Sequence, residues 1–238
     1  MRRVPVIATL LAAVVLTTLP ARAGGALHLK LGGFFPAGGG DLWESNEEVF
    51  TFETSDLDDL TFGVAWIAPL NNHVELGFNV DFYDSVARAG YRGVTDEYGY
   101  AILHDSRLET MPMIVDVRVL PFGRYGGAPG TGGPVALKPV VYLGGGLGAT
   151  YWEYEEVGDF VLFDDPDLPI VYDRFVDDGV AFAIQALAGI ELPLSHSTGV
   201  LFESRYTWCD DELSGDFSGF GTIDLSGWSV AGGFSLRF

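Results

Sequence analysis

The strongest constraint on the fold is a strict alternation of apolar and polar residues. Its clearest instance covers residues 74–82, where Val74, Leu76, Phe78, Val80 and Phe82 are separated by Glu75, Gly77, Asn79 and Asp81. A period of two places the apolar side chains on one face of a β-strand and the polar ones on the other, whereas a helix requires a period near 3.6. The segment therefore predicts a strand with two different faces.

The same alternation recurs in seven further segments. They are Leu27–Leu31, Leu60–Ala68, Met111–Val119, Val141–Tyr151, Phe182–Leu192, Val200–Trp208 and Trp228–Phe238. We expect eight strands of about nine to thirteen residues, a length that crosses a bilayer when the strand is tilted.

The first 23 residues have the arrangement of a secretory signal peptide. Arg2 and Arg3 precede the apolar run Val4–Leu19, and Ala21-Arg22-Ala23 has the form of a cleavage site. We expect cleavage before Gly24, which leaves residues 24–238 as a single barrel domain. An uncleaved anchor is the weaker alternative, because the apolar run is shorter than the roughly 20 residues of a membrane helix.

The connections between the expected strands alternate in length. The long ones are residues 36–59, 86–107, 153–179 and 209–224, and the short ones are residues 70–73, 121–137 and 193–198. Outer-membrane barrels show this asymmetry, with long loops outside and both termini at the periplasmic side. Residues 121–137 are long for a turn, and their glycines indicate a flexible linker within one domain.

Periodicity alone leaves open which face is inside, since a soluble lipid-carrying barrel also alternates. The polar face carries small residues such as Gly63, Gly77 and Gly146, while the other face carries most of the Phe, Trp, Leu and Val. Eight strands enclose a space just wide enough to be filled by side chains, so the bulky face would overfill it. The sequence predicts an all-β fold, an eight-stranded antiparallel up-and-down transmembrane β-barrel with its bulky face toward lipid.

These residues give the chain a resemblance to the superfamily of small outer-membrane β-barrels, which includes the OmpA-type, OmpX-type, OmpW-type and opacity-like proteins. The most specific elements are Lys138–Gly148, Ala186–Leu194, Glu203–Tyr206 and the terminal Phe238. The resemblance implies a place in the outer membrane of a Gram-negative-type cell envelope, and folding by periplasmic chaperones and the barrel-assembly machinery. The assembly signal of such families matches Gly233, Leu236 and Phe238, whereas Ala231 replaces its polar residue.

Nine ionisable residues fall on the inward face, five acids and four bases. They are Lys30, Glu75, Asp81, Asp116, Arg118, Glu191, Glu203, Arg205 and Arg237. In a narrow interior with little water, such near-balance favours ion pairs that brace and plug the barrel over an open channel. The alternative is that several of them lie at the barrel ends and are solvated.

The acidic excess lies outside the expected strands. The four long segments hold 26 of the 33 acids but only four arginines, so we expect an outer face with a charge of about −22. A net charge of −20 excludes a nucleic-acid partner. We expect either a hydrated, repulsive surface or divalent cations that bridge it to lipopolysaccharide phosphates. The regular spacing of a calcium loop is missing, and no metal site or cofactor is expected.

An enzyme of the lipid-modifying kind needs a base, a nucleophile and an orienting acid. His196, Ser197 and Glu203 offer these groups, but Glu203 lies about five residues up the next strand, roughly 15 Å from His196 at the strand rise. We therefore expect no enzymatic activity. The expected function is a monomeric barrel with a structural or surface-interaction role, and the alternative is a pore or lateral conduit for small apolar molecules.

Overall fold

The computed structural model describes residues 24–125, 138–163 and 167–238. The expected signal peptide, residues 1–23, lies outside the described residues. The strands are β1 (Ala26–Pro36), β2 (Asp59–Pro69), β3 (Val74–Thr95), β4 (Ala101–Val119), β5 (Val140–Val161), β6 (Ile170–Pro193), β7 (Thr198–Glu212), β8 (Thr222–Asp224) and β9 (Gly227–Arg237). The helices of the described residues are α2 (Asp41–Val49) and the short 3-10 turns η1 (Thr54–Leu57) and η2 (Gly215–Phe217). None of these helices is long and apolar enough to cross a membrane.

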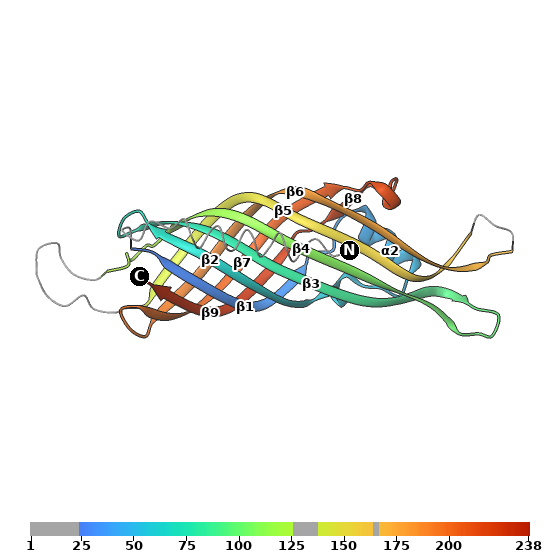
Figure 1. Cartoon of the computed structure of the whole chain (residues 1–238), viewed down its shortest axis with the longest axis horizontal. Coiled ribbons are helices and arrows are strands. Elements are labelled where there is room, and N and C mark those ends of the chain that lie inside the picture. The colour runs from blue at the N-terminus through green and yellow to red at the C-terminus, as the bar shows by residue number, and fades with distance from the viewer. Residues whose placement is uncertain (1–23, 126–137, 164–166) are drawn as a thin grey trace, which may run out of the picture.

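The strands close into one antiparallel ring. Each of β1 to β7 pairs with the next, β7 pairs with β9, and β9 returns to β1 through pairs such as Leu29↔Phe234. The three-residue β8 only extends the outer end of β7, through Asp210↔Asp224 and its neighbours. Eight strands therefore form the wall, which confirms the predicted barrel, and the C-terminus lies at the end opposite α2 (Figure 1).

In the half of the barrel away from α2 the bulky apolar side chains point outward. Leu147, Phe182 and Phe234 are each 60–63% exposed, whereas Lys30 and Asp116 on the inward face are almost fully buried. Glycines make room for these inward groups. A Cβ on Gly63 would collide with the carboxylate of Asp81. The outward apolar band is the surface that a membrane-spanning barrel presents to lipid.

Four strands are much longer than the sequence pattern predicted. β3 has 22 residues and β6 has 24, so the segments 86–107 and 153–179, expected to be loops, are mostly strand. The alternation continues past Phe82, but its polarity reverses: Tyr83 and Ala87 now point inward and are buried, while Asp84 points outward. This reversal marks the outer edge of the lipid-facing band. The expectation of long loops was wrong there because it assumed that the apolar residues of a strand stay on the outward face, whereas beyond Phe82 they lie on the inward face.

We call the part of the molecule beyond this edge the head. It comprises β3 to β6 beyond the outward row Asp84, Glu109, Glu153 and Asp178, together with α2, η1, η2 and β8. Its interior is an apolar core in which Trp43 of α2 is fully buried, stacks on Phe52 at 5.9 Å and meets Tyr154 of β5 edge-on at 5.3 Å. The head lies at the end of the barrel opposite the C-terminus (Figure 1).

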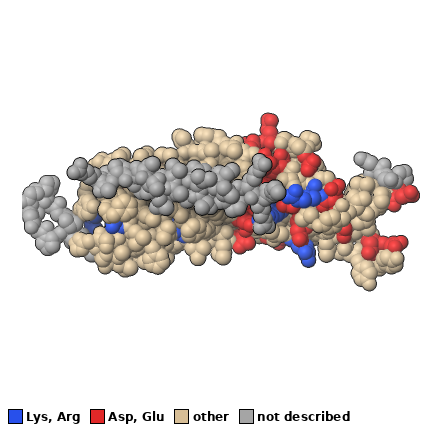
Figure 2. Space-filling model, viewed as in Figure 1, with Lys and Arg blue, Asp and Glu red and all other residues tan. Residues whose placement is uncertain are grey.

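Helix α2 closes the mouth of the barrel. It begins after Gly40, whose φ of 90° lies in the region that favours glycine, and Asp41 and Glu44 occupy its first turn, where carboxylates are favourable. Leu42, Trp43 and Asn46 form its buried face. The exposed acids gather over this end of the molecule, whereas the visible face of the barrel is largely free of them (Figure 2).

Candidate functional site

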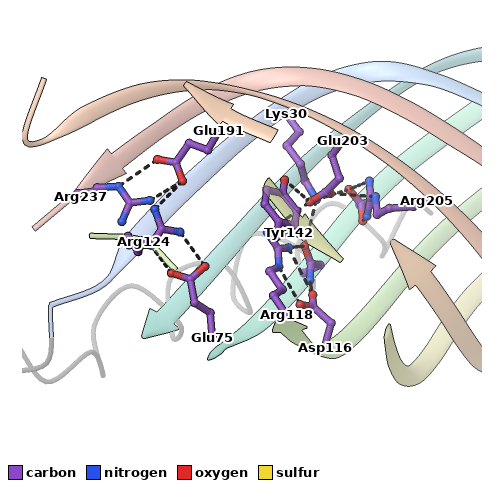
Figure 3. Close-up of polar contacts among 12 residues, drawn as sticks. Lys30, Glu75, Asp116, Arg118, Arg124, Tyr142, Glu191, Glu203, Arg205 and Arg237 are labelled. Carbon is purple, nitrogen blue, oxygen red and sulfur yellow. Dashed lines mark hydrogen bonds and ion pairs between the residues drawn. The ribbon is translucent and has the colours of Figure 1, made fainter. Parts of the chain in front are cut away.

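The middle of the lumen holds a buried cluster of three acids and three bases, which we call the central cluster (Figure 3). Its charged members are Lys30, Asp81, Asp116, Arg118, Glu203 and Arg205. Each of these side chains is at most 6% exposed. The structure thus brings six of the nine expected residues together, from strands β1, β3, β4 and β7, with a net charge of zero.

Glu203 contacts all three cations of the central cluster. Its Oε1 lies 3.1 Å from the Nζ of Lys30 and 3.2 Å from the Nε of Arg205, and its Oε2 lies 3.3 Å from Nη1 of Arg118. The hydroxyl of Tyr142 donates to the same Oε2 at 2.9 Å. One carboxylate therefore compensates three cations that have no access to water.

The remaining pairs fix the orientation of each guanidinium. Arg205 forms a bidentate pair with Asp81, and the Nε of Arg118 donates to Asp116 at 2.8 Å. Asn79 links the two sides, because its Oδ1 accepts from Lys30 at 3.0 Å and from Arg118 at 3.2 Å. Bidentate and bridged pairs of this kind restrict rotation, so the cluster is a rigid crosslink between opposite walls.

A second cluster, which we call the C-terminal cluster, closes the other end of the lumen. Arg124 donates to Glu75 through Nε and Nη2 and to Glu191 through Nη1 at 2.9 Å. Arg237 also pairs with Glu191, at 3.0 Å for Nε to Oε1. Glu75, Glu191 and Arg237 were expected in the lumen, but Arg124 was not.

Arg124 enters the lumen from the turn after β4. The turn is held by the side-chain oxygen of Asn72, which accepts from the backbone N–H groups of Arg124 and Tyr125, and Gly123 has a φ of +64°. The interpretation of residues 121–137 as a plain linker was therefore wrong for their first part; residues 126–137 lie outside the described residues. With Arg124 included, the two clusters together contain five acids and five Lys or Arg residues among the described residues.

The head contains a buried carboxylate with no cation against it in the described residues. Glu156 accepts from Asn46 of α2 at 2.8 Å and from the hydroxyl of Tyr154 at 2.6 Å. Burial raises the pKa of Glu156 above its ordinary value, although both hydrogen bonds act in the opposite direction. Since Asn46 also donates toward the Tyr154 hydroxyl at 2.8 Å, this group ties α2 to the barrel wall.

We predict that ionisation of Glu156 weakens the head. The pKa of Glu156 is higher in the folded protein than in the unfolded chain. Its stabilising contribution to the folded head is therefore present at a pH below the ordinary Glu pKa, and it is lost as the pH rises through the folded value. His104 acts oppositely, since burial lowers its pKa to about 4. Comparing Glu156→Gln with the wild type separates the effect of Glu156 from that of His104, which both proteins contain. Proteolysis of the head should be slower in the variant at neutral pH, and the two proteolysis rates should converge near pH 4. Equal rates at every pH would contradict the assignment.

The hydrogen-bond ladder between β3 and β4 is interrupted at the outer edge of the lipid-facing band. Pairs run through Val80↔Met113 and resume at Tyr83↔Thr110, so the two pairs that Asp81 and Phe82 would make are missing. Pro112, which has no N–H, lies in this gap. A cavity of about 20 Å³ inside the barrel and a groove of about 350 Å³ outside it share Thr61, Tyr83 and Thr110.

The residues of the expected assembly signal lie on the closing strand. Leu236 and Phe238 are 41% and 63% exposed on the lipid-facing side. A Cβ on Gly233 would collide with the carbonyl oxygen of Leu29, so this glycine allows β9 to approach β1. The structure gives Gly233 a packing role, and recognition of the three residues during assembly stays a prediction.

The groups weighed for catalysis lie apart. His196 and Ser197 are exposed in the turn between β6 and β7, whereas Glu203 is buried in the central cluster. Cys209 is buried near the outer end of β7.

No family model matches the sequence, and no curated protein matches it. Among solved structures, Neisserial surface protein A matches with a TM-score of 0.46 and 7% identity, over 92% of this chain and all of that one. OprG from Pseudomonas aeruginosa matches with a TM-score of 0.47 and 11% identity, over 91% and 96% of the two chains. A major outer membrane protein from Thermus thermophilus gives 0.47 and 12%, over 91% and 100%. This likeness concerns the fold alone.

Proposed function

We propose that this protein is a closed outer-membrane barrel whose working part is the head, an acidic surface that mediates interactions outside the cell. The observation that carries the proposal is the contrast between the lumen of the barrel and the head. The lumen is filled by paired charges, while the head has a packed core of its own and directs its acids outward. The proposal assigns no catalytic step to the chain.

Both ends of the lumen are occupied. Trp43 of α2 fills the mouth and donates from its indole nitrogen to the carbonyl of Asp224 at 2.8 Å. Arg124 bridges Glu75 and Glu191 at the other end. A solute that entered along the axis would have to break two sets of buried contacts, so a structural and surface role is favoured over an axial pore.

The head is suited to binding because it is already ordered. Its strands continue the barrel wall, and its core packs α2, η1 and η2 against them. A surface that is folded before it binds loses less conformational entropy on association than a disordered loop does. Its acidic character selects cationic partners and surfaces, and it also suits divalent cations that bridge to lipopolysaccharide phosphates.

The test is adhesion of whole cells to lysine-coated beads. Glu44, Glu48 and Glu97 are exposed in the head, and their replacement by Gln should reduce adhesion. The matched control changes the same residues to Asp, which keeps the charge and should preserve adhesion. High salt should remove the difference because exposed charges are screened. Equal adhesion of the Gln and Asp variants at low salt would refute the acidic head as the binding surface.

A lateral conduit for small apolar molecules is the second candidate, and the interrupted ladder at Pro112 favours it. An apolar solute could pass between Phe82 and Met111 without crossing the central cluster. The inner cavity of about 20 Å³ has room for little more than a water molecule, which ranks this function second. Pro112→Val restores a donor to the ladder; a conduit predicts slower uptake of apolar solutes into cells carrying this variant, and a closed barrel predicts no change.

A further inference from the structure

The cavity of about 20 Å³ inside the barrel lies between the central cluster and the core of the head. Its lining includes Asp81 and Arg205 of the central cluster. It also includes Phe34, Tyr83 and Leu225, which belong to the head core. Every strand of the barrel wall contributes at least one residue to this lining, so the cavity spans the lumen where its charged part meets its apolar part.

The rest of the lining is polar. Apart from Pro112, these residues carry hydroxyl or amide groups: Thr61, Thr110, Thr150, Gln185, Thr207 and Ser229. Cavities that stay dry are lined by apolar side chains, whereas buried hydroxyl and amide groups require hydrogen-bond partners. The composition of the lining therefore favours a polar occupant over an apolar one.

Gln185 of β6 supplies a free acceptor to this cavity. The residue is only 3% exposed, and its Nε2 donates to the hydroxyl of Thr207 at 3.0 Å. Its Oε1 is buried and accepts no hydrogen bond from the described residues. Because an unpaired buried acceptor is costly, the side chain calls for a donor that the neighbouring strands do not provide.

Arg205 supplies a free donor. Its two terminal nitrogens pair with Asp81. Its Nε lies 3.2 Å from Oε1 of Glu203, but the direction is not that of a hydrogen bond, and this N–H has no acceptor among the described residues. The hydroxyl of Thr150 lines the same cavity and can act as donor or acceptor. The occupant must therefore both donate and accept hydrogen bonds.

We propose that the cavity binds one water molecule, which donates to Oε1 of Gln185 and accepts from Nε of Arg205. A volume of about 20 Å³ is that of a single water site, and two to four polar partners are what such a site requires. The guanidinium of Arg205 disfavours a cation in this position, and the carboxylate of Asp81 disfavours an anion.

The bound water extends the central cluster to a further strand. The charged members of the cluster lie on β1, β3, β4 and β7, and Gln185 adds β6 through the water. A polar, occupied site at this depth also opposes the passage of apolar solutes through the cavity. The proposal is independent of the function of the head.

The first test is a crystal structure of the detergent-refolded wild type at a resolution that shows ordered water. A density peak should lie within hydrogen-bond distance of both Oε1 of Gln185 and Nε of Arg205. Crystals soaked in Rb⁺ or Br⁻ should show no anomalous signal at this peak. An empty position would overturn the proposal, and an anomalous signal there would identify an ion in place of water.

The second test counts long-lived waters in solution by oxygen-17 relaxation dispersion of the same refolded protein. Gln185→Leu removes the free acceptor and should lose one long-lived water relative to the wild type. The matched control is Ser229→Ala, which removes a hydroxyl from the same cavity wall but keeps the free acceptor, and it should retain the water. Heat-dependent gel mobility confirms that each variant is folded. Equal numbers of long-lived waters in the wild type and folded Gln185→Leu would contradict the proposal.

Discussion

Glu203→Gln should lower the free energy of unfolding by about 3–5 kcal/mol, the range for removing one partner from a buried ion pair. The substitution keeps the shape of the side chain but leaves Lys30, Arg118 and Arg205 against only two carboxylates. Urea unfolding of the detergent-refolded protein, followed by heat-dependent gel mobility, measures the loss. The matched control is Asp210→Asn on the same strand, whose side chain is exposed and which should change stability by less than about 1 kcal/mol. A Glu203 variant as stable as this control would show that the central cluster does not brace the barrel.

Trp43→Ala should unfold the head while the barrel remains intact. The side chain is fully buried between Phe52 and Tyr154, and truncation of a buried aromatic residue costs about 3–5 kcal/mol. The cost falls on α2, so protease should cut residues 41–57 in the variant and spare them in the wild type. Trp208→Ala is the control, because that side chain is half exposed on the lipid face and does not touch the head core. Cleavage at the same rate in Trp43→Ala and wild type would mean that the helix is not held by this residue.

The barrel itself could be predicted because its signal is local. Each strand within the membrane has the apolar face outward along its whole length, as in Val74–Phe82, and this pattern needs no knowledge of distant residues. The head could not be found in the same way, since its apolar residues lie on the inward, buried face, whereas those of the membrane band lie on the outward face. Tyr83 and Ala87 follow the inward positions of Asn79 and Asp81, so a search for one continuing polarity stops at Phe82. The point where the polarity reverses is itself readable, and it gives the edge of the membrane band.

The alternation along each strand predicts which charged side chains point into the lumen, but it does not predict which of them pair. The alternation assigned five acids and four bases to the inside, and this excess of one acid indicated a missing base. The missing base is Arg124, which lies in a turn, where the alternation of a strand does not apply. Likewise, Trp43 and Asn46 belong to a helix about 110 residues before its contacts on β5, and no local pattern specifies a contact over that separation. Pro112 was visible in the sequence, yet its effect depends on which neighbouring strand its missing N–H would face.

Single-channel recording of the purified protein in planar bilayers tests the closed barrel most directly. The central and C-terminal clusters fill the lumen, and Trp43 fills its mouth. The wild type should therefore give no unitary current above the bilayer background at any applied voltage that the membrane tolerates. A reproducible, ohmic current that persists after removal of detergent would show an open axial path and would contradict the account.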